Sequence, residues 1–410
     1  CWRHDELADG ATDGAASTVS ALDGLYRAAR AAFDSDERFA RRARDRVVAL
    51  QSGDEATLTA WRELVAESER AFQAIYGRLG VLLRPEDSAG ESSYNSMLAD
   101  VVDELVRAGV AVDSDGALCV FFDEFSGPGG DPVPLIVRKT DGGYNYGTTD
   151  LATIRHRIRD LKATRLLYVV GSPQSLHFKM IFETARRMGW LTDDIEATHV
   201  PFGSILGRDG KPFKTRSGRT VTLLSLLDDA VERARSEIAD KPHGLDEAQL
   251  EAVVRDAGIG AVKYADLSTS RTKDYVFDVD RMVSFNGNTG VYLQYAHARI
   301  RSILRRLPES ELDPVVDTAL PLHPAERALG LLLDEFADTL AEVADTLEPH
   351  RLCGYLFSLA KAFTDFYESC PVLKADTDAS RRNRIALCRL TGDTLAEGLG
   401  LLGIAAPDRM

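Results

Sequence analysis

The stretch YNYGTTDLATIRHRIRDLKATRLLYVVGSPQSLHFKM, residues 144–180, decides the fold of this chain. Its apolar run at 166–170 has the length of a short buried strand, and Gly171 and Pro173 end that strand. A helical pattern follows, with Gly189 as its expected stop, and a second strand-to-helix junction precedes it at 146–150. Strands that alternate with helices predict an α/β fold, in which ligands bind outside the carboxyl ends of parallel strands.

The composition bounds the class of protein. The chain has 410 residues, 44% hydrophobic and 28% charged, which is typical of a soluble protein with two or three domains. No apolar run approaches the ~20 residues that cross a bilayer, so we expect no membrane association. The five cysteines lack zinc-ligand spacing, which favours reduced cytoplasmic thiols and no metal site. The net charge of −15 argues against binding polyanions through bulk charge, but a local basic face would still permit RNA binding.

Strand signals stop near Gly290, and helical patterns continue to the end of the chain. These patterns cover residues 292–306, 324–346, 351–370 and 381–402, and they predict a separate helical bundle. Before the stretch that decides the fold, an apolar stripe of three-or-four spacing within 54–79 is interpreted as helix core. Between the two parts, we expect one helix at 247–257 and a second that starts at Gly258.

Polar residues at the strand-to-helix junctions are candidates for binding a ligand. Asp150, four residues after Tyr146, either caps its helix or complements the helix dipole, or it offers a carboxylate to a cationic group. Gln174 either caps the following helix or holds a substrate through its amide. His177 is a structural histidine more often than a catalyst.

A cationic loop, GRDGKPFKTRSG at 207–218, follows these junctions. Lys211, Lys214 and Arg216 repel one another and gain nothing from burial, but a polyphosphate that develops charge during nucleotidyl transfer would use them. The alternative is a solvated hairpin. The sequence contains no Walker A motif and no GxGxxG motif, so neither phosphate-loop class is supported.

Taken in order, these motifs resemble the arginyl-tRNA synthetases, a family of class I aminoacyl-tRNA synthetases. The resemblance runs from about Leu25 to Met410, and many motifs in the right order make it specific. The motifs are LQSGD at 50–54, GESSYN at 90–95, YGTTD at 146–150, GKPFKTRSG at 210–218, FNGNTG at 285–290 and YLQYAH at 292–297.

The resemblance implies a fold in four parts. Residues 1–137 would hold a linker and a mostly helical insertion, 138–225 the second half of a Rossmann-type catalytic domain, 226–285 a connecting region, and 286–410 an all-α anticodon-binding bundle. Family members use ATP and magnesium to convert L-arginine to arginyl-adenylate and then acylate tRNA(Arg). They are commonly monomers.

The resemblance also implies roles for the candidate residues. Tyr146, Asp150 and Gln174 match the arginine site, which suits a guanidinium that wants a carboxylate. Lys211, Lys214 and Arg216 correspond to the catalytic KMSKS loop, and the ATP-binding positions are His177, Lys211 and Lys214.

Two departures from the family pattern stand out. The HxGH signature that binds ATP is absent from this sequence, and the loop reads FKTRS at 213–217. We therefore expect an N-terminally truncated synthetase whose activity on its own is in doubt. Two other functions stay open: an arginine-activating ligase that acts on a small amine or peptide, and a non-catalytic tRNA-binding remnant. The helical bundle favours tRNA as the acceptor.

Aromatic residues of the bundle are candidates for tRNA contacts. Tyr292 and Tyr295 lie three residues apart and so share a helix face. Together with Tyr355 and Met410, they match anticodon-loop contacts in the family, where bases stack on aromatic rings. The alternative for all four residues is the bundle core. Arg299 and Arg301 on the same helix are candidates for phosphate contacts.

Overall fold

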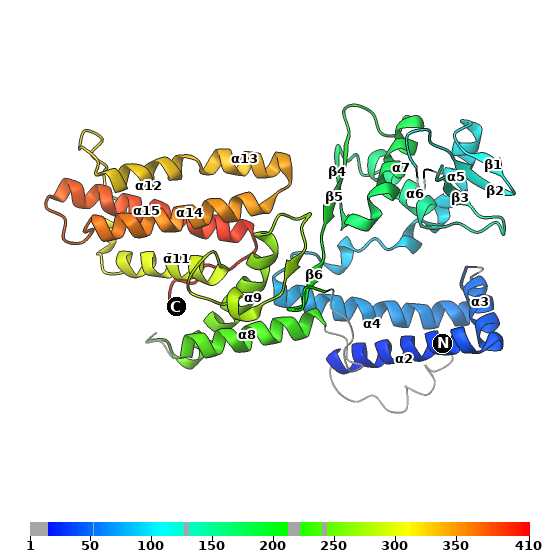
Figure 1. Ribbon diagram of the computed structural model, residues 1–410, viewed down its shortest axis with the longest axis horizontal. Coiled ribbons are helices and arrows are strands. Elements are labelled where there is room, and N and C mark those ends of the chain that lie inside the picture. The colour runs from blue at the N-terminus through cyan, green and yellow to red at the C-terminus, as the bar shows by residue number, and fades with distance from the viewer. Residues whose placement is uncertain (1–14, 52, 127–129, 131, 212–221, 240–243) are drawn as a thin grey trace. The chain divides into compact units, whose positions relative to one another are not determined.

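The computed structural model describes residues 15–51, 53–126, 130, 132–211, 222–239 and 244–410. The chain divides into two units, Cys1–Ser88 and Ala89–Met410. Figure 1 labels the helices and strands of both units.

The first unit consists of helices. They are α2 (Ala15–Ser35), α3 (Glu37–Gln51), α4 (Glu55–Leu79) and the short 3-10 turn η1 (Pro85–Asp87). Asp54 caps α4, because its carboxylate accepts a hydrogen bond from the Thr57 amide at 2.9 Å. The apolar stripe of α4 is half-buried except at Phe72, which is 54% exposed, so the predicted core face is only partly covered.

The second unit begins with an α/β region. Its elements are η2 (Glu91–Met97), α5 (Leu98–Arg107), β1 (Val112–Ser114), β2 (Ala117–Val120), β3 (Leu135–Arg138), α6 (Tyr146–Arg159), β4 (Arg165–Gly171), η3 (Ser172–Gln174), α7 (Ser175–Arg187) and β5 (Glu196–Phe202). Strands β1, β2 and β3 form an antiparallel sheet, whereas β4 and β5 pair in parallel and α7 connects them. Helices α5, α6 and α7 share one apolar core with these strands.

Strand β4 is buried on one face only. Leu166 and Tyr168 are 5% and 7% exposed, but Leu167 and Val169, which point to the opposite face, are 41% and 66% exposed. The predicted strand is thus present, with one face in the core and the other face accessible. The strand before α6, β3, pairs with β2.

The region that follows contains one continuous helix where two were expected. Its elements are β6 (Ile205–Leu206), α8 (Leu223–Ala239), α9 (Glu247–Leu267), β7 (Tyr275–Val276), which pairs in parallel with β6, and α10 (Val279–Met282). Gly258 does not break α9. A Cβ atom there would lie 2.6 Å from the Val231 Cα atom, so this glycine allows α8 and α9 to approach closely.

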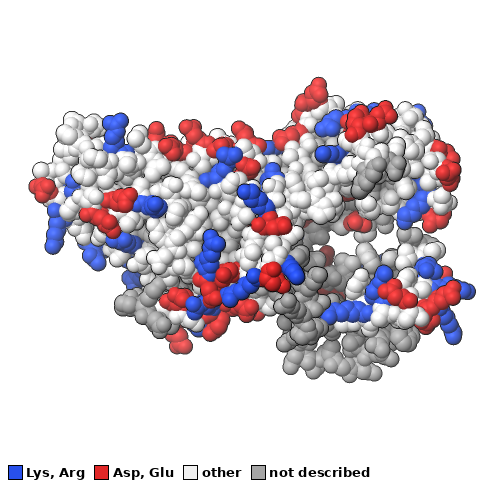
Figure 2. All heavy atoms as spheres, in the orientation of Figure 1, with Lys and Arg blue, Asp and Glu red and all other residues white. Residues whose placement is uncertain are grey.

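The chain ends in a helical bundle, as the sequence predicts. It contains α11 (Gly290–Leu304), η4 (Glu309–Glu311), α12 (Pro324–Asp334), α13 (Phe336–Thr346), α14 (Pro349–Ser369) and α15 (Asp378–Leu401) around a second apolar core. On the face drawn in Figure 2, cationic and anionic side chains are interspersed over these helices. Among the helices of the described residues, none is long and apolar enough to span a membrane.

Candidate functional site

The start of α6 is held in place by its own backbone contacts. The Asn145 side chain caps the helix by accepting a hydrogen bond from the Gly147 amide at 3.1 Å. The Thr148 hydroxyl donates to the Val137 carbonyl of β3 at 2.5 Å. A Cβ atom at Gly147 would lie 2.9 Å from a methyl carbon of Leu135, so the helix start packs tightly on β3. These contacts fix the positions of the side chains that follow in the first turns.

Asp150 does not cap the helix. It is the fifth residue of α6, after the capping residue Asn145, so the capping interpretation of Asp150 is excluded. One of its carboxylate oxygens lies 2.6 Å from Nε2 of His177 on α7. The Asp150 side chain is 30% exposed and that of His177 10%. A buried imidazole therefore orients a carboxylate that solvent and ligands can still reach.

Tyr146 completes a small cluster with this pair. Its ring centroid lies 4.9 Å from that of His177, and the residue is 62% exposed. Gln174 directly precedes α7, is exposed and makes no capping hydrogen bond with its side chain. The capping alternative for Gln174 is therefore also excluded, and its amide is available to a ligand.

His177 packs as a structural residue rather than an open ligand-binding group. Its ring meets Phe178 edge-on at 5.3 Å, and its Nε2 atom is occupied by Asp150. His177 thus contacts the Asp150 carboxylate, and its expected contact with ATP stays a prediction. Sequence reasoning missed this pair because its members lie 27 residues apart. The sequence does contain one signal for this pair, namely a histidine in the first turn of the helix that follows β4.

Tyr168 of β4 lies beneath this cluster and was not singled out from the sequence. Its ring centroid is 5.1 Å from that of Phe178, and the Arg157 guanidinium lies 5.2 Å from the Tyr168 ring. Burial raises the pKa of the Tyr168 phenol. The phenol therefore stays neutral and adds no second negative charge near Asp150.

The cationic loop is described only at its beginning. The Gly207 amide donates to the Lys211 carbonyl at 2.8 Å, which closes a tight turn, and Lys211 is exposed. Arg208 is paired with Asp278 at 3.1 Å and Asp280 at 2.6 Å. Lys214 and Arg216 lie outside the described residues. The loop therefore starts from an anchored base, with Lys211 accessible to an anion.

The candidate aromatic residues of the bundle separate into two groups. Tyr292 is half-buried with its ring 5.6 Å from that of Phe357, and Tyr295 is 42% exposed. Tyr355, by contrast, is 8% exposed, and its hydroxyl donates to the Leu332 carbonyl at 2.9 Å. The expectation that Tyr355 meets an anticodon base is corrected here, because a buried ring with a bonded hydroxyl is part of the core.

The C-terminal segment after α15 lies along α11. Gln294 donates to the Ala405 carbonyl at 2.9 Å, and Nδ1 of His297 lies 3.0 Å from the Pro407 carbonyl. Arg301 binds the Asp408 carboxylate at 2.8 Å. These contacts hold the half-buried Met410 at the end of a segment fixed to the helix of Tyr292.

The two arginines considered for phosphate contacts are already engaged. Arg301 is paired with Asp408, so its charge is offset within the fold. Arg299 lies over the ring of Tyr367, with its guanidinium carbon 4.6 Å from the centroid. Both side chains thus have partners within the chain, and their contact with tRNA phosphates stays a prediction.

Comparison with known proteins decides the family. A family model described as "tRNA synthetases class I (R), catalytic domain" matches residues 7–279, and one described as "DALR anticodon binding domain" matches residues 293–410. The Arginine--tRNA ligase of Frankia casuarinae is 66% identical over 409 residues, which are all of this chain and 68% of that protein. The chain belongs to the arginyl-tRNA synthetases.

Further relatives agree with this assignment. The Arginine--tRNA ligase of Thermobifida fusca is 57% identical to this synthetase chain, over 97% of the chain and 68% of the relative. Among solved structures, the arginyl-tRNA synthetase of Plasmodium falciparum matches with a TM-score of 0.76 at 27% identity, over 91% of this chain and 62% of the other. The synthetase chain thus spans about two thirds of the length of the relatives it matches.

The structure brings together part of the candidate site of the synthetase. Tyr146, Asp150 and His177 are in contact, and Gln174 stands at the start of the helix that carries His177. No group of three or more His, Cys, Asp or Glu residues is arranged to hold a metal ion among the residues described.

Proposed function

We propose that Tyr146, Asp150 and Gln174 form the site where this arginine–tRNA ligase binds its arginine substrate. The observation that carries the proposal is the 2.6 Å contact between Asp150 and His177 on a helix that Asn145 already caps. One carboxylate oxygen is held by the imidazole, and the other oxygen is left to accept N–H groups. A planar guanidinium with its fork of donors is the group that such a carboxylate binds best.

The neighbouring residues support the same ligand. The exposed ring of Tyr146 can cover the guanidinium, which is attracted to an aromatic face. The Gln174 amide offers both a donor and an acceptor to the polar end of an amino acid. His177 acts as a positioning residue, because its imidazole holds the Asp150 carboxylate.

We further propose that Lys211, with Lys214 and Arg216, acts on the phosphates of ATP. Adenylate formation joins a carboxylate oxygen of arginine to the α-phosphorus and releases pyrophosphate, so negative charge builds on the leaving group. Cations placed there stabilise the transition state. In this proposal, Mg²⁺ is carried by the ATP phosphates.

We also propose that residues 138–225 form the second half of a Rossmann-type domain. The parallel pair β4–β5, connected through α7, supports the second half of a Rossmann-type domain within the family match to residues 7–279. The domain boundaries near residues 138, 226 and 286 remain our proposal, as do a monomeric state and a cytoplasmic location.

For tRNA, we propose that Tyr292, Tyr295 and Met410 meet the anticodon loop of tRNA(Arg). Tyr292 and Tyr295 keep ring surface accessible, and the tail contacts of α11 hold Met410 beside the same helix. Tyr355 supports the bundle from within. The match of residues 293–410 to an anticodon-binding domain favours tRNA over a small amine as the acceptor.

The arginine site is tested by replacing one carboxylate oxygen of Asp150 with an amide nitrogen. In the full-length synthetase, Asp150→Asn should raise the KM for arginine by about 10- to 150-fold, the equivalent of a charged hydrogen bond of roughly 1.5–3 kcal/mol. The KM for ATP should change little. Asp160→Asn is the matched control, because Asp160 makes a 2.6 Å contact with His156 on the same helix. Equal effects of both variants would refute the assignment.

A further inference from the structure

A cavity of about 350 Å³ lies away from the arginine site, in the region that connects it to the bundle. Its walls come from the C-terminal half of α9, from β7 and α10, and from the two residues before α11. None of the lining residues belongs to α6 or α7. Ala261, Ala265 and Met282 give the cavity apolar surface, while Arg281 and Asn288 bring polar groups to it.

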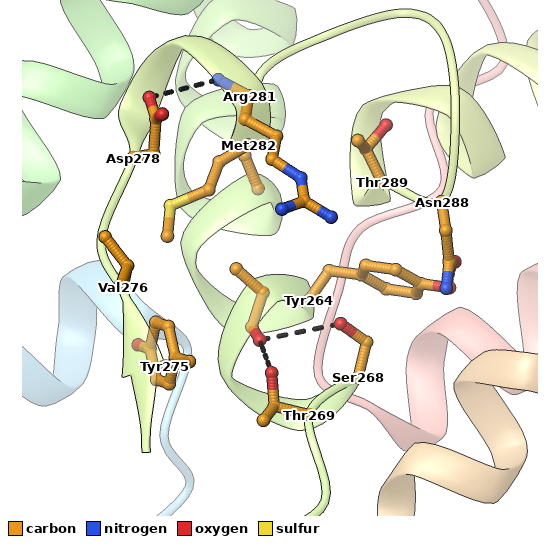
Figure 3. A pocket seen from close by; sticks show the side chains of 12 residues that line it. Tyr264, Ser268, Thr269, Tyr275, Val276, Asp278, Arg281, Met282, Asn288 and Thr289 are labelled. Atoms are coloured by element: carbon orange, nitrogen blue, oxygen red, sulfur yellow. Dashed lines mark hydrogen bonds between the residues drawn. The ribbon is translucent and has the colours of Figure 1, made fainter. Parts of the chain in front are cut away.

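Arg281 directs its guanidinium into this cavity, between the side chains of Tyr264 and Thr289 (Figure 3). Its backbone amide donates to Asp278 at 3.5 Å, and its backbone carbonyl accepts from the Ser284 amide at 3.4 Å. Its guanidinium has neither an ion pair nor a hydrogen bond to any other part of the chain that the structure describes. The cavity therefore contains an uncompensated positive charge.

The one acidic group at the cavity does not cancel this charge. Asp278 lines the cavity, but its carboxylate is already paired with Arg208 at 3.1 Å and accepts from the Arg281 amide. The carboxylate is thus directed to the anchored base of the cationic loop. Arg281 remains the group available to a ligand.

The remaining polar groups favour an anion as well. Tyr264 donates its hydroxyl to the Asn288 side-chain oxygen at 2.6 Å, which orients that amide and leaves its N–H groups as donors. Thr289 caps α11 by accepting from the Tyr292 amide at 3.1 Å, so the positive end of a 15-residue helix dipole lies at the cavity wall. A cation, an oriented amide and a helix start together select a negatively charged group.

We infer that this cavity binds one nucleotide unit, with its phosphate on Arg281 and Asn288 and its sugar or base on the apolar wall. Ligand cavities start at roughly 300 Å³, so the volume suits a single nucleotide rather than a longer segment. The source of that nucleotide is the backbone of bound tRNA. The inference rests on the proposed function, since it assumes that the chain binds tRNA, and it adds a contact separate from the anticodon residues.

The test removes the charge and follows tRNA binding at several salt concentrations. In the full-length synthetase, Arg281→Met should weaken tRNA binding by about 3- to 10-fold at low salt. The slope of log K against log salt should shrink by about 0.7–0.9, the loss of one phosphate contact. Arg281→Lys should keep most of the slope. Arg281→Gln is a second neutral variant, so that a folding defect specific to methionine does not decide the outcome.

A control and a second ligand separate the possible results. Arg255→Met removes an exposed charge from α9 that is paired with Asp256 and does not line the cavity, and it should leave the slope unchanged. Free AMP, tested by equilibrium dialysis, separates the two sources of a nucleotide. If both neutral Arg281 variants lose tRNA affinity, the nucleotide in the cavity belongs to the tRNA backbone. If they lose only AMP binding, the cavity binds a free nucleotide, and the tRNA backbone is excluded as its source.

Failure of the inference differs from failure of the proposed function. If the wild-type synthetase binds tRNA and the neutral Arg281 variants bind it equally well with the same salt slope, and AMP binding is also unchanged, the cavity is not a nucleotide site. If the wild-type protein does not bind tRNA at all, the proposed function itself is wrong.

Discussion

The proposed arginine site and the proposed tRNA-binding tyrosines of the bundle, Tyr292 and Tyr295, both lie on helices, but their side chains are held in different ways. At α6 and α7, two polar side chains from separate helices meet at 2.6 Å, and a capped helix start holds one of them. On the bundle, Tyr295 stays accessible while Tyr355 is buried. Whether a polar residue belongs to a binding site is therefore indicated by its hydrogen-bond partners. For an aromatic residue, it is indicated by the exposed fraction of the ring.

The two regions also differ in what holds them in place. The start of α6, which carries Asp150, is held by contacts close in sequence, such as Asn145 with Gly147 and Thr148 with Val137. Helix α11, which carries the two tyrosines, depends on a distant segment, because Gln294 and His297 bind the carbonyl groups of Ala405 and Pro407. We therefore expect changes in the C-terminal segment to affect tRNA binding and to spare arginine binding.

The largest expected effect separates the two groups of tyrosines within the bundle. Tyr355→Ala should lower the free energy of unfolding by about 3–5 kcal/mol, because it removes a buried ring and leaves a cavity. Tyr295→Ala, at a 42% exposed position, should cost less than about 1 kcal/mol. Urea unfolding of both variants measures the difference. Similar losses would mean that the bundle does not divide its tyrosines in this way.

The next effect tests whether the accessible ring of Tyr292 binds tRNA. Tyr292→Ala should weaken tRNA binding roughly tenfold or more, since stacking of one base contributes about 1–3 kcal/mol. Tyr292→Phe keeps the ring and should keep most of the affinity, and arginine and ATP should bind both variants normally. Unchanged tRNA affinity in Tyr292→Ala, or an unfolded bundle, would return Tyr292 to the core.

A smaller effect probes the arginine site through its positioning residue. His177→Phe keeps a ring but removes the partner of Asp150, so the KM for arginine should rise about 2- to 12-fold, the equivalent of roughly 0.5–1.5 kcal/mol. His156→Phe, which removes the equally short contact with Asp160 on α6, is the control. If His156→Phe raises the KM for arginine as much as His177→Phe does, His177 has no specific role in positioning Asp150.

The smallest effect concerns the pH dependence of the contact between α11 and the C-terminal segment. Burial lowers the pKa of His297 below its ordinary 6.5, although the Pro407 carbonyl opposes the shift. The unfolded chain therefore takes up this proton first as the pH falls. The stabilisation is complete above about pH 6.5 and is lost as the pH falls through the lower folded pKa.

Unfolding at a series of pH values, compared between the wild type and His297→Gln, measures this contribution. The wild type should lose more stability than the variant below about pH 6.5. Parallel pH profiles would show that His297 does not contribute.

Much of the helical architecture could be predicted from the sequence, because its signals are local. The Asp54 cap and the bundle helices follow from capping and periodicity within a few residues. The continuity of α9 through Gly258 could not be predicted, since the reason is the approach of α8 from elsewhere in the chain. A glycine has the same local signature whether it ends a helix or lets another helix pack against it.

The candidate site shows the same limit. The sequence pointed to Tyr146, Asp150 and Gln174 individually, but the pair of Asp150 with His177 exists only once α6 and α7 are packed together. The burial of Tyr355 likewise depends on its contact with Leu332 of α12. Which polar groups meet and which rings are covered are tertiary properties, and periodicity does not contain them.

In the proposed arginine site, Asp150 recognises the positive charge of the substrate. The most direct test compares arginine with citrulline, a neutral analogue of nearly the same shape, in the full-length synthetase and its Asp150→Asn variant. The ratio of kcat/KM for arginine to that for citrulline should fall by about 10- to 150-fold in the variant, since the charged hydrogen bond is lost only with arginine. A ratio that is the same in both proteins would contradict the assignment of Asp150 to the guanidinium.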